Sequence, residues 1–152
     1  MISTERSAIA AEFTRRFSHL AEKLGPDHLN LLLDGASVQE VPAGRAVIRD
    51  RMPVDFLYFV LDGSLGVYIE NADKSQRIAT VQPGEWLGEI SVLSGEMLAS
   101  ATITPDSVSK LMKIHHLTFE KLIAEDEVVA KALLEDLIGL MAKRLRTTQT
   151  NG

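Results

Sequence analysis

The residues best suited to binding a small ligand lie between Pro83 and Ile103, in the stretch PGEWLGEISVLSGEMLASATI. Gly88 lets the backbone approach a ligand closely, and free amides after a glycine can form an anion-binding concavity. The carboxylate of Glu89 can accept hydrogen bonds from ligand hydroxyl groups, although it does not attract an anion. The alternative is a tight turn between two strands with Glu89 in solvent, because short glycine motifs often occur without a ligand.

Residue types that carry out catalysis are sparse in this chain. It has no cysteine, which excludes disulfides, thiolate nucleophiles and cysteine-based metal sites. A metal site inside a β-barrel needs histidines and a carboxylate that project inward from the strands. His115 and His116 are neighbours, and alternate strand residues point to opposite faces, so both cannot face a barrel from one strand. No Ser-His-Asp arrangement can be placed, and we therefore predict no catalytic residue and no metal.

The composition favours a soluble protein that does not bind nucleic acid. Sixteen Lys plus Arg against twenty-one Asp plus Glu give a formal net charge of −5, whereas phosphate neutralisation needs basic groups. The longest strongly apolar stretch, residues 56–61, is far shorter than the ~20 residues of a membrane-spanning helix. The N-terminal sequence MISTERSAIAAEF lacks the basic-then-apolar pattern of a signal peptide. We therefore expect a cytoplasmic location and no membrane contact.

Periodicity divides the chain into helices, strands and helices again. Apolar residues recur at helical spacing over residues 5–24, Gly25-Pro26 ends that helix, and a short helix follows. Turn signals then separate short β-type segments, which is typical of a sandwich or barrel. Helical spacing returns from about residue 118. The predicted strands cover residues 37–41, 46–48, 56–61, 65–70, 77–81, 99–104 and 108–114.

The long helix predicted over residues 128–145 has apolar residues on more than the roughly 100° stripe that covers one core. A helix that is apolar on two sides needs two partners, and a second copy of the same helix is the simplest second partner. The alternative is burial in a deep groove of its own chain. Gly139 costs ~1 kcal/mol relative to alanine in mid-helix, which close approach of a helix or ligand would explain. The residues predicted to form the dimer are Leu133, Leu137, Leu140 and Met141.

Three segments of these elements follow one another in the order VIRDRMPVDFLYFVLDGSLGVYIE, PGEWLGEISVL and LLEDLIGLMAKRLRTTQT. Together with the order of the elements, they resemble the cyclic-nucleotide-binding domain, most of all the sensor half of catabolite activator protein-type bacterial regulators. The resemblance implies a mainly β fold: an antiparallel double-stranded β-helix (jelly roll, cupin-like β-roll) with N-terminal helices and a long C-terminal helix. We expect one domain over residues 1–152, with helices to residue 35, the β-roll over 36–116 and helices over 117–149.

The resemblance also implies which residues would meet a ligand. In that family the glutamate of Gly-Glu bonds the ribose hydroxyl, while loop amides and an arginine hold the cyclic phosphate. The segment PGEWLGEISVL resembles the opening of that family's phosphate-binding cassette, whose end corresponds to Ala99-Ser100-Ala101. The glycine and glutamate of the cassette correspond to Gly88 and Glu89, and Ile90 follows them. At the spacing of the activator family the phosphate arginine corresponds to Ala99, and at the shorter loop spacing of kinase regulatory subunits it corresponds to Leu98. Ser100 matches a phosphate contact. The cassette is therefore predicted to be degenerate.

No Lys or Arg occurs between Arg77 and Lys110, so the cassette contains no substitute cation. We therefore expect low affinity for cyclic AMP and cyclic GMP. Arg51 stands where many family members have a turn glycine, and its guanidinium either reaches the pocket or lies in solvent. Thr148 aligns with a position that meets the base in the activator family; the alternative is an exposed helix end.

The leading hypothesis is a non-enzymatic regulatory module that forms a homodimer, binds the usual cyclic nucleotides weakly and acts through another ligand or a partner protein. One alternative is a true cyclic-nucleotide sensor that acts through a separate partner and takes its cation from elsewhere, such as Arg51. A second alternative, from another class, is a cupin-like metal enzyme. The activator family continues into a helix-turn-helix module, and with the chain ending at Gly152 we expect no DNA-binding domain.

Overall fold

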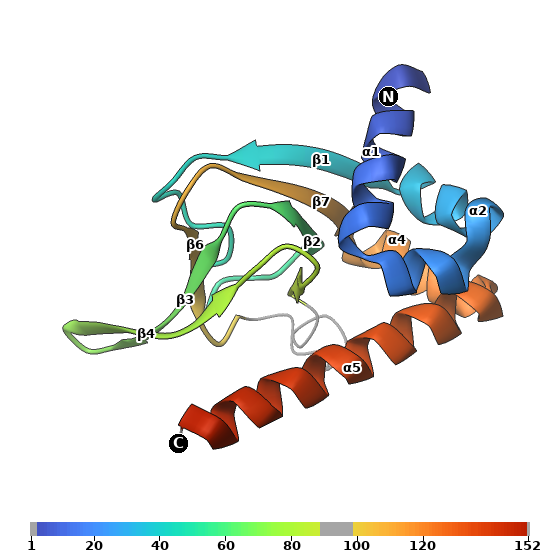
Figure 1. The fold of residues 1–152 in the computed structure, drawn as a ribbon. Coiled ribbons are helices and arrows are strands. Elements are labelled where there is room, and N and C mark those ends of the chain that lie inside the picture. Colours follow the sequence, from blue (N-terminus) through green and yellow to red (C-terminus); the bar gives the residue numbers. More distant parts are fainter. Residues whose placement is uncertain (1–2, 89–98, 152) are drawn as a thin grey trace. The chain divides into compact units, whose positions relative to one another are not determined.

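The computed structural model describes residues 3–88 and 99–151 (Figure 1). The chain forms two compact units. One is helical and consists of Met1–Asp34 together with Glu120–Gly152, and the other, Gly35–Phe119, holds the strands. Each unit is described separately below.

The helical unit contains α1 (Ser3–Arg16), α2 (Ser18–Asp34), most of α4 (His116–Glu125) and α5 (Glu127–Asn151). The single helix predicted over residues 5–24 is wrong, because the chain bends at Phe17. Helical hydrogen bonding continues across the bend, with the Phe17 amide donating to the Phe13 carbonyl at 2.7 Å. The two phenyl rings stack at 4.9 Å and both are buried. The structure thus divides the predicted helix into two, α1 and α2, on either side of Phe17.

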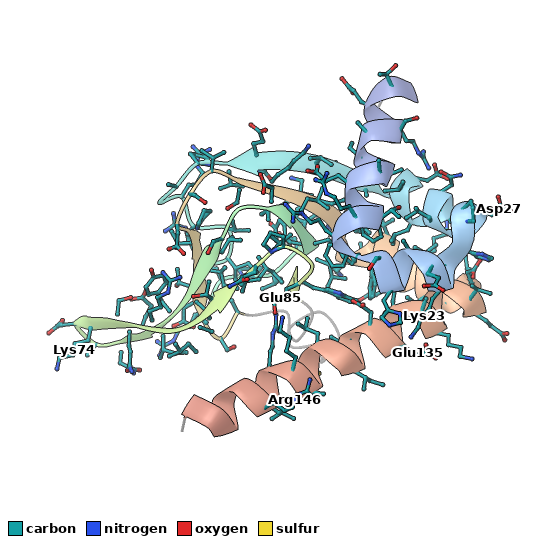
Figure 2. All side chains as sticks on the ribbon, viewed as in Figure 1. Lys23, Asp27, Lys74, Glu85, Glu135 and Arg146 are labelled. Carbon is teal, nitrogen blue, oxygen red and sulfur yellow. The ribbon has the colours of Figure 1, made fainter. Side chains whose placement is uncertain are left out.

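The predicted break at Gly25-Pro26 is confirmed, because Gly25 has non-helical angles (φ 73°, ψ 168°) inside α2. Helical structure resumes at Pro26, where a missing amide proton costs nothing. Ion pairs fix the helices within this unit. Arg6 on α1 pairs with Asp34 at the end of α2, and Lys23 on α2 pairs with Glu135 on α5 (Figure 2). The hydrogen bond from Lys23 lowers the pKa of Glu135.

The α5 helix has a buried side and an exposed apolar stripe. Of the four residues predicted to form the dimer, three are buried within the chain and Met141 is 44% exposed. Gly139 has no atom within 4 Å of an added Cβ, so packing within the described chain does not require a glycine there. The buried residues are Leu133, Leu137 and Leu140, and the exposed stripe is Leu134, Ile138, Met141 and Leu145.

The strands form two antiparallel sheets, which confirms the predicted β-roll with helices before and after it in the chain. The four-stranded sheet has the order β1 (Ala36–Val41), β7 (Ser109–His115), β2 (Phe56–Asp62), β5 (Trp86–Leu87). The three-stranded sheet has the order β4 (Lys74–Val81), β3 (Leu65–Asn71), β6 (Thr102–Pro105) (Figure 1). The core of the β-roll contains large buried side chains from both sheets, among them Phe59, Trp86, Leu57, Leu61, Leu65, Leu111, Met112 and Ile114.

Three predicted strands need correction, and one strand was missed. The strand predicted over residues 77–81 begins at Lys74, which pairs with Asn71 of β3. The predicted strand over residues 46–48 is reduced to one bridge, between Ile48 and Ile103. The strand predicted from residue 99 begins at Thr102, and Ala99 is instead hydrogen-bonded to a turn at Arg51 and Met52. The two-residue strand β5 was not predicted, and it forms because Trp86 pairs with Phe59 of β2, with ring centroids 5.0 Å apart. Partners distant in sequence determine the last three of these differences.

Candidate functional site

The turn at Pro83-Gly84, which opens the candidate site, is held against β2 by hydrogen bonds. The Gly84 amide donates to the Val60 carbonyl at 3.0 Å, and the Val60 amide donates to the Glu85 carbonyl at 2.9 Å. The nearly buried Glu85 carboxylate accepts from the Gln82 amide at 2.9 Å, which closes the turn from inside. Sequence reasoning gave Glu85 no role. Its position three residues after Gln82 is the spacing of such side-chain-to-backbone bonds.

Gly88 is the last residue that the structure describes before Ala99, and its backbone requires glycine for two reasons. Its φ is +85°, in the left-handed region that side chains disfavour. An added Cβ would also lie 2.7 Å from the Phe56 carbonyl oxygen and 3.2 Å from Cγ1 of Val54. The predicted cassette glycine therefore has a structural necessity, whatever its role toward a ligand.

The next cassette residues, Glu89 and Ile90, lie outside the described residues. The description resumes at Ala99, which is 7% exposed, and Ser100, which is exposed. The Ala99 amide donates to the Met52 carbonyl at 3.0 Å, and the Ala99 carbonyl accepts from the Arg51 amide at 2.9 Å. The position predicted to have lost the phosphate arginine is thus fixed to a turn nearly fifty residues earlier in the sequence.

That turn spans residues 49–52 and is closed by the Met52 amide, which donates to the Arg49 carbonyl at 3.1 Å. A second bond, from the Asp50 amide to Oγ1 of Thr102 at 3.0 Å, connects it to β6. Arg51 has a φ of +64° and an exposed side chain. The structure therefore brings Arg51 and Ala99 together, whereas Thr148 lies on α5, in a stretch of which the structure describes the backbone alone.

A separate polar network lies on the three-stranded sheet. The guanidinium of Arg77 donates to both carboxylate oxygens of Asp106 at 2.7 Å, to the Tyr68 hydroxyl at 3.2 Å and to Thr80 at 2.8 Å. The Ser64 hydroxyl also donates to Asp106, at 3.3 Å. The hydrogen bond from Arg77 holds the pKa of Asp106 below its usual value. Each group already has a partner, so we interpret this network as structural.

This ion pair predicts a specific pH dependence. Because the pKa of Asp106 is lower in the folded state, its contribution to stability is present above the unfolded value of 3.8 and is lost as the pH falls through the folded value. Asp106→Asn should therefore lower stability at neutral pH, and the difference from wild type should shrink below pH 3.8. Urea denaturation across the acidic range measures this. Asp73→Asn, at the exposed β3–β4 hairpin tip, is the control, and equal effects of both variants would contradict the prediction.

A group of aromatic and basic side chains lies along β2 and β7. Nζ of Lys113 lies 4.6 Å from the centroid of the Phe56 ring, and His115 meets the same ring edge-on at 5.3 Å. Burial raises the pKa of Tyr58, and the nearby Asp55 carboxylate raises it further. Phe56 pairs with His115, and Tyr58 with Lys113, as cross-strand partners. These contacts stabilise the sheet as such pairs do elsewhere.

Among residues 3–88 and 99–151, no three or more His, Cys, Asp or Glu side chains are grouped so as to hold a metal ion. The rings of His115 and His116 stack at 4.6 Å. Strand alternation does not separate them, because β7 ends at His115 and α4 begins at His116. None of the described helices is long and apolar enough to cross a membrane.

These features define a class of protein: a double-sheet antiparallel roll with a glycine-dependent backbone at Gly88 and with Ala99 hydrogen-bonded to the turn of residues 49–52. The family model of the cyclic nucleotide-binding domain matches residues 38–126, and the chain belongs to that family. The predicted relationship to cyclic-nucleotide-binding domains is therefore confirmed.

Known proteins show the same relationship. The chain is 30% identical over 112 residues to a cyclic nucleotide-gated potassium channel of Mesorhizobium japonicum, covering 74% of this chain and 30% of the channel. The crystal structure of a cyclic nucleotide-binding domain from Methylobacillus flagellatus matches 91% of the chain and 83% of that domain, with a TM-score of 0.77 and 21% identity. Catabolite activator protein of Thermus thermophilus matches with a TM-score of 0.69 and 25% identity, over 87% of this chain and 60% of that one. The chain spans 30% to 56% of the length of the curated relatives it matches.

Proposed function

We propose that this chain is a non-enzymatic regulatory module in which the pocket of the cyclic-nucleotide-binding fold has lost its phosphate arginine and holds cyclic AMP and cyclic GMP weakly. Its response would pass to a partner protein, or follow another small ligand, in the cytoplasm. Family membership supports the class of function. The residue at position 99 supports the low affinity.

The observation that carries the proposal is the environment of Ala99. Its backbone is bonded on both sides to residues 51 and 52, and its short side chain brings no charge to the end of the cassette. A charge-assisted hydrogen bond to a buried phosphate contributes about 1.5–3 kcal/mol, and losing a buried partner costs ~2–5 kcal/mol. At 1.4 kcal/mol per factor of ten, affinity would fall roughly ten- to several-thousand-fold.

Calorimetric titration with cyclic AMP and cyclic GMP tests the proposal, after a check that no nucleotide co-purifies. Dissociation constants near or above millimolar, or no heat, agree with a pocket that lacks the arginine of its cassette. Micromolar binding would overturn the low-affinity part and favour a true cyclic-nucleotide sensor. Stoichiometric iron, zinc or manganese in the purified protein would instead favour the cupin-like enzyme.

We also propose that two copies associate through the exposed stripe of α5. Leu134, Ile138, Met141 and Leu145 follow one another at spacings of four, three and four residues, the pattern of a coiled-coil seam. An exposed apolar stripe of this kind is more stable when it packs against the same stripe of a second copy than when it contacts water. The proposed interface replaces three of the residues predicted from sequence, because Leu133, Leu137 and Leu140 are buried within the chain.

Light scattering tests this association, because a dimer has twice the 16.7 kDa mass of one chain. Ile138→Lys should give a folded monomer, since the isoleucine is 66% exposed in the single chain and a lysine there would place charge in the seam. Gly139→Lys is the matched control: it adds the same charge one position along, where an added Cβ meets nothing. A wild-type monomer at tens of micromolar would refute the association.

A further inference from the structure

The turn that holds Ala99 has the hydrogen-bond pattern of a β-bulge. The Arg51 amide donates to the Ala99 carbonyl at 2.9 Å, and the Ala99 amide donates to the carbonyl of the next residue, Met52, at 3.0 Å. The first residue of such a bulge takes the left-handed conformation and is usually glycine. Arg51 occupies this position with a φ of +64°. Arg51, with its long side chain, therefore occupies a backbone conformation that favours glycine.

Arg51 is unusual in the described chain for this reason. Five described glycines have positive φ, and the only other residue of residues 3–88 and 99–151 that does so is Ala72, at the β3–β4 hairpin tip. Left-handed backbone is strained for any residue with a Cβ. Such strain persists where the surrounding structure enforces it, and it concentrates at functional positions. The bonds to Ala99 are what enforce it here.

The guanidinium of Arg51 is exposed, and no carboxylate of the described residues pairs with it. By contrast, Arg6 and Arg77 are both held by aspartates. An arginine carries five donors in a planar fork that matches the oxygens of a phosphate, on a long flexible stem. The backbone of Arg51 is hydrogen-bonded to Ala99, and no described carboxylate pairs with its guanidinium. Arg51 is therefore joined to that position more directly than Arg49, the other exposed arginine of the turn.

We propose that Arg51 supplies the positive charge for the phosphate of a cyclic nucleotide in this chain, in place of the side chain missing at Ala99. This inference rests on the proposed function for the ligand class and for the position of the missing cation. The bulge brings the backbone of Arg51 to the end of the cassette, and the long side chain completes the distance. The affinity that remains in the pocket then depends on a residue outside the cassette.

The test is a titration of amide chemical shifts in the 15N-labelled full chain with cyclic AMP, which measures affinities into the millimolar range. Arg51→Gln should weaken binding at least tenfold, and Arg51→Lys should weaken it less, because lysine keeps the charge but not the fork. Arg45→Gln, which removes another exposed arginine, should leave affinity unchanged. In an Ala99→Arg background, Arg51→Gln should cost less than in wild type, because two cations at one phosphate are coupled.

Stability separates a functional arginine from an incidental one. Arg51→Gly and Ala72→Gly should both raise the melting temperature by relieving a left-handed residue, and only Arg51→Gly should lose nucleotide affinity. Wild-type affinity in Arg51→Gln would overturn the inference and leave the low-affinity proposal intact. No shift with wild-type protein at tens of millimolar would also overturn it, while agreeing with that proposal. Micromolar wild-type binding that Arg51→Gln abolishes would support it and overturn the low affinity instead.

Discussion

Replacing Ala99 with arginine should raise affinity for cyclic AMP at least tenfold. The substitution leaves the backbone bonds of residue 99 to Arg51 and Met52 in place, since both use main-chain atoms. It adds the charge that the resemblance assigns to this position. A charge-assisted bond of about 1.5–3 kcal/mol corresponds to roughly ten- to a hundredfold in affinity. Calorimetry on wild type and variant, side by side, measures the gain.

Two controls make this result interpretable. Ala79→Arg introduces the same residue on the exposed strand β4 and should leave affinity unchanged, which excludes a general effect of net charge. Because Ala99 is 7% exposed, a thermal melt must show that the variant folds. A folded Ala99→Arg protein without any gain would mean that the pocket has diverged beyond its arginine. Salt should weaken the gained affinity, as expected for a charge contact with an anion.

The sequence was sufficient to predict the order of the elements. Strands β1, β2, β3 and β7 were predicted within one or two residues, because each alternates or concentrates apolar residues between turn signals. The break at Gly25-Pro26 was also predicted, since that dipeptide has a local conformational cause. Local signals are enough where local chemistry decides the structure.

Elements that depend on distant partners were not predicted. The strand β5 is two residues long and exists because Trp86 meets Phe59 of β2. At the candidate site, Gly88 and Ala99 were identified from their motif. The bonds from Ala99 to residues 51 and 52 were not, because no spacing rule relates positions so far apart.

The exposed stripe of α5 shows the same limit on one helix. Apolar spacing indicated that the helix is apolar on two sides. It led to Leu133, Leu137 and Leu140 being assigned to the dimer interface, whereas the structure buries these three side chains within the chain. Spacing gives the faces of a helix, whereas the rest of the fold decides which face is covered. The outward face is therefore known only from the structure.

Gly88→Ala should destabilise the protein more than any other single methyl addition at the candidate site. The left-handed φ of +85° costs about 1–2 kcal/mol for a residue with a Cβ. The new Cβ would also lie 2.7 Å from the Phe56 carbonyl oxygen, an overlap that costs typically ~1–3 kcal/mol to relieve. Together these predict a loss of about 2–5 kcal/mol in the free energy of unfolding. Urea denaturation of wild type and variant measures it.

Gly44→Ala separates the two causes, because Gly44 has the same φ of +85° and nothing within 4 Å of an added Cβ. It should therefore show only the conformational cost of about 1–2 kcal/mol. The excess of Gly88→Ala over Gly44→Ala measures the contact with Phe56, which fixes the start of the cassette against β2. Equal losses of unfolding free energy in both variants would mean that the backbones of Gly88 and Phe56 can move apart at no cost in stability. The entry to the cassette would then be held by the turn at Glu85 rather than by Gly88 itself.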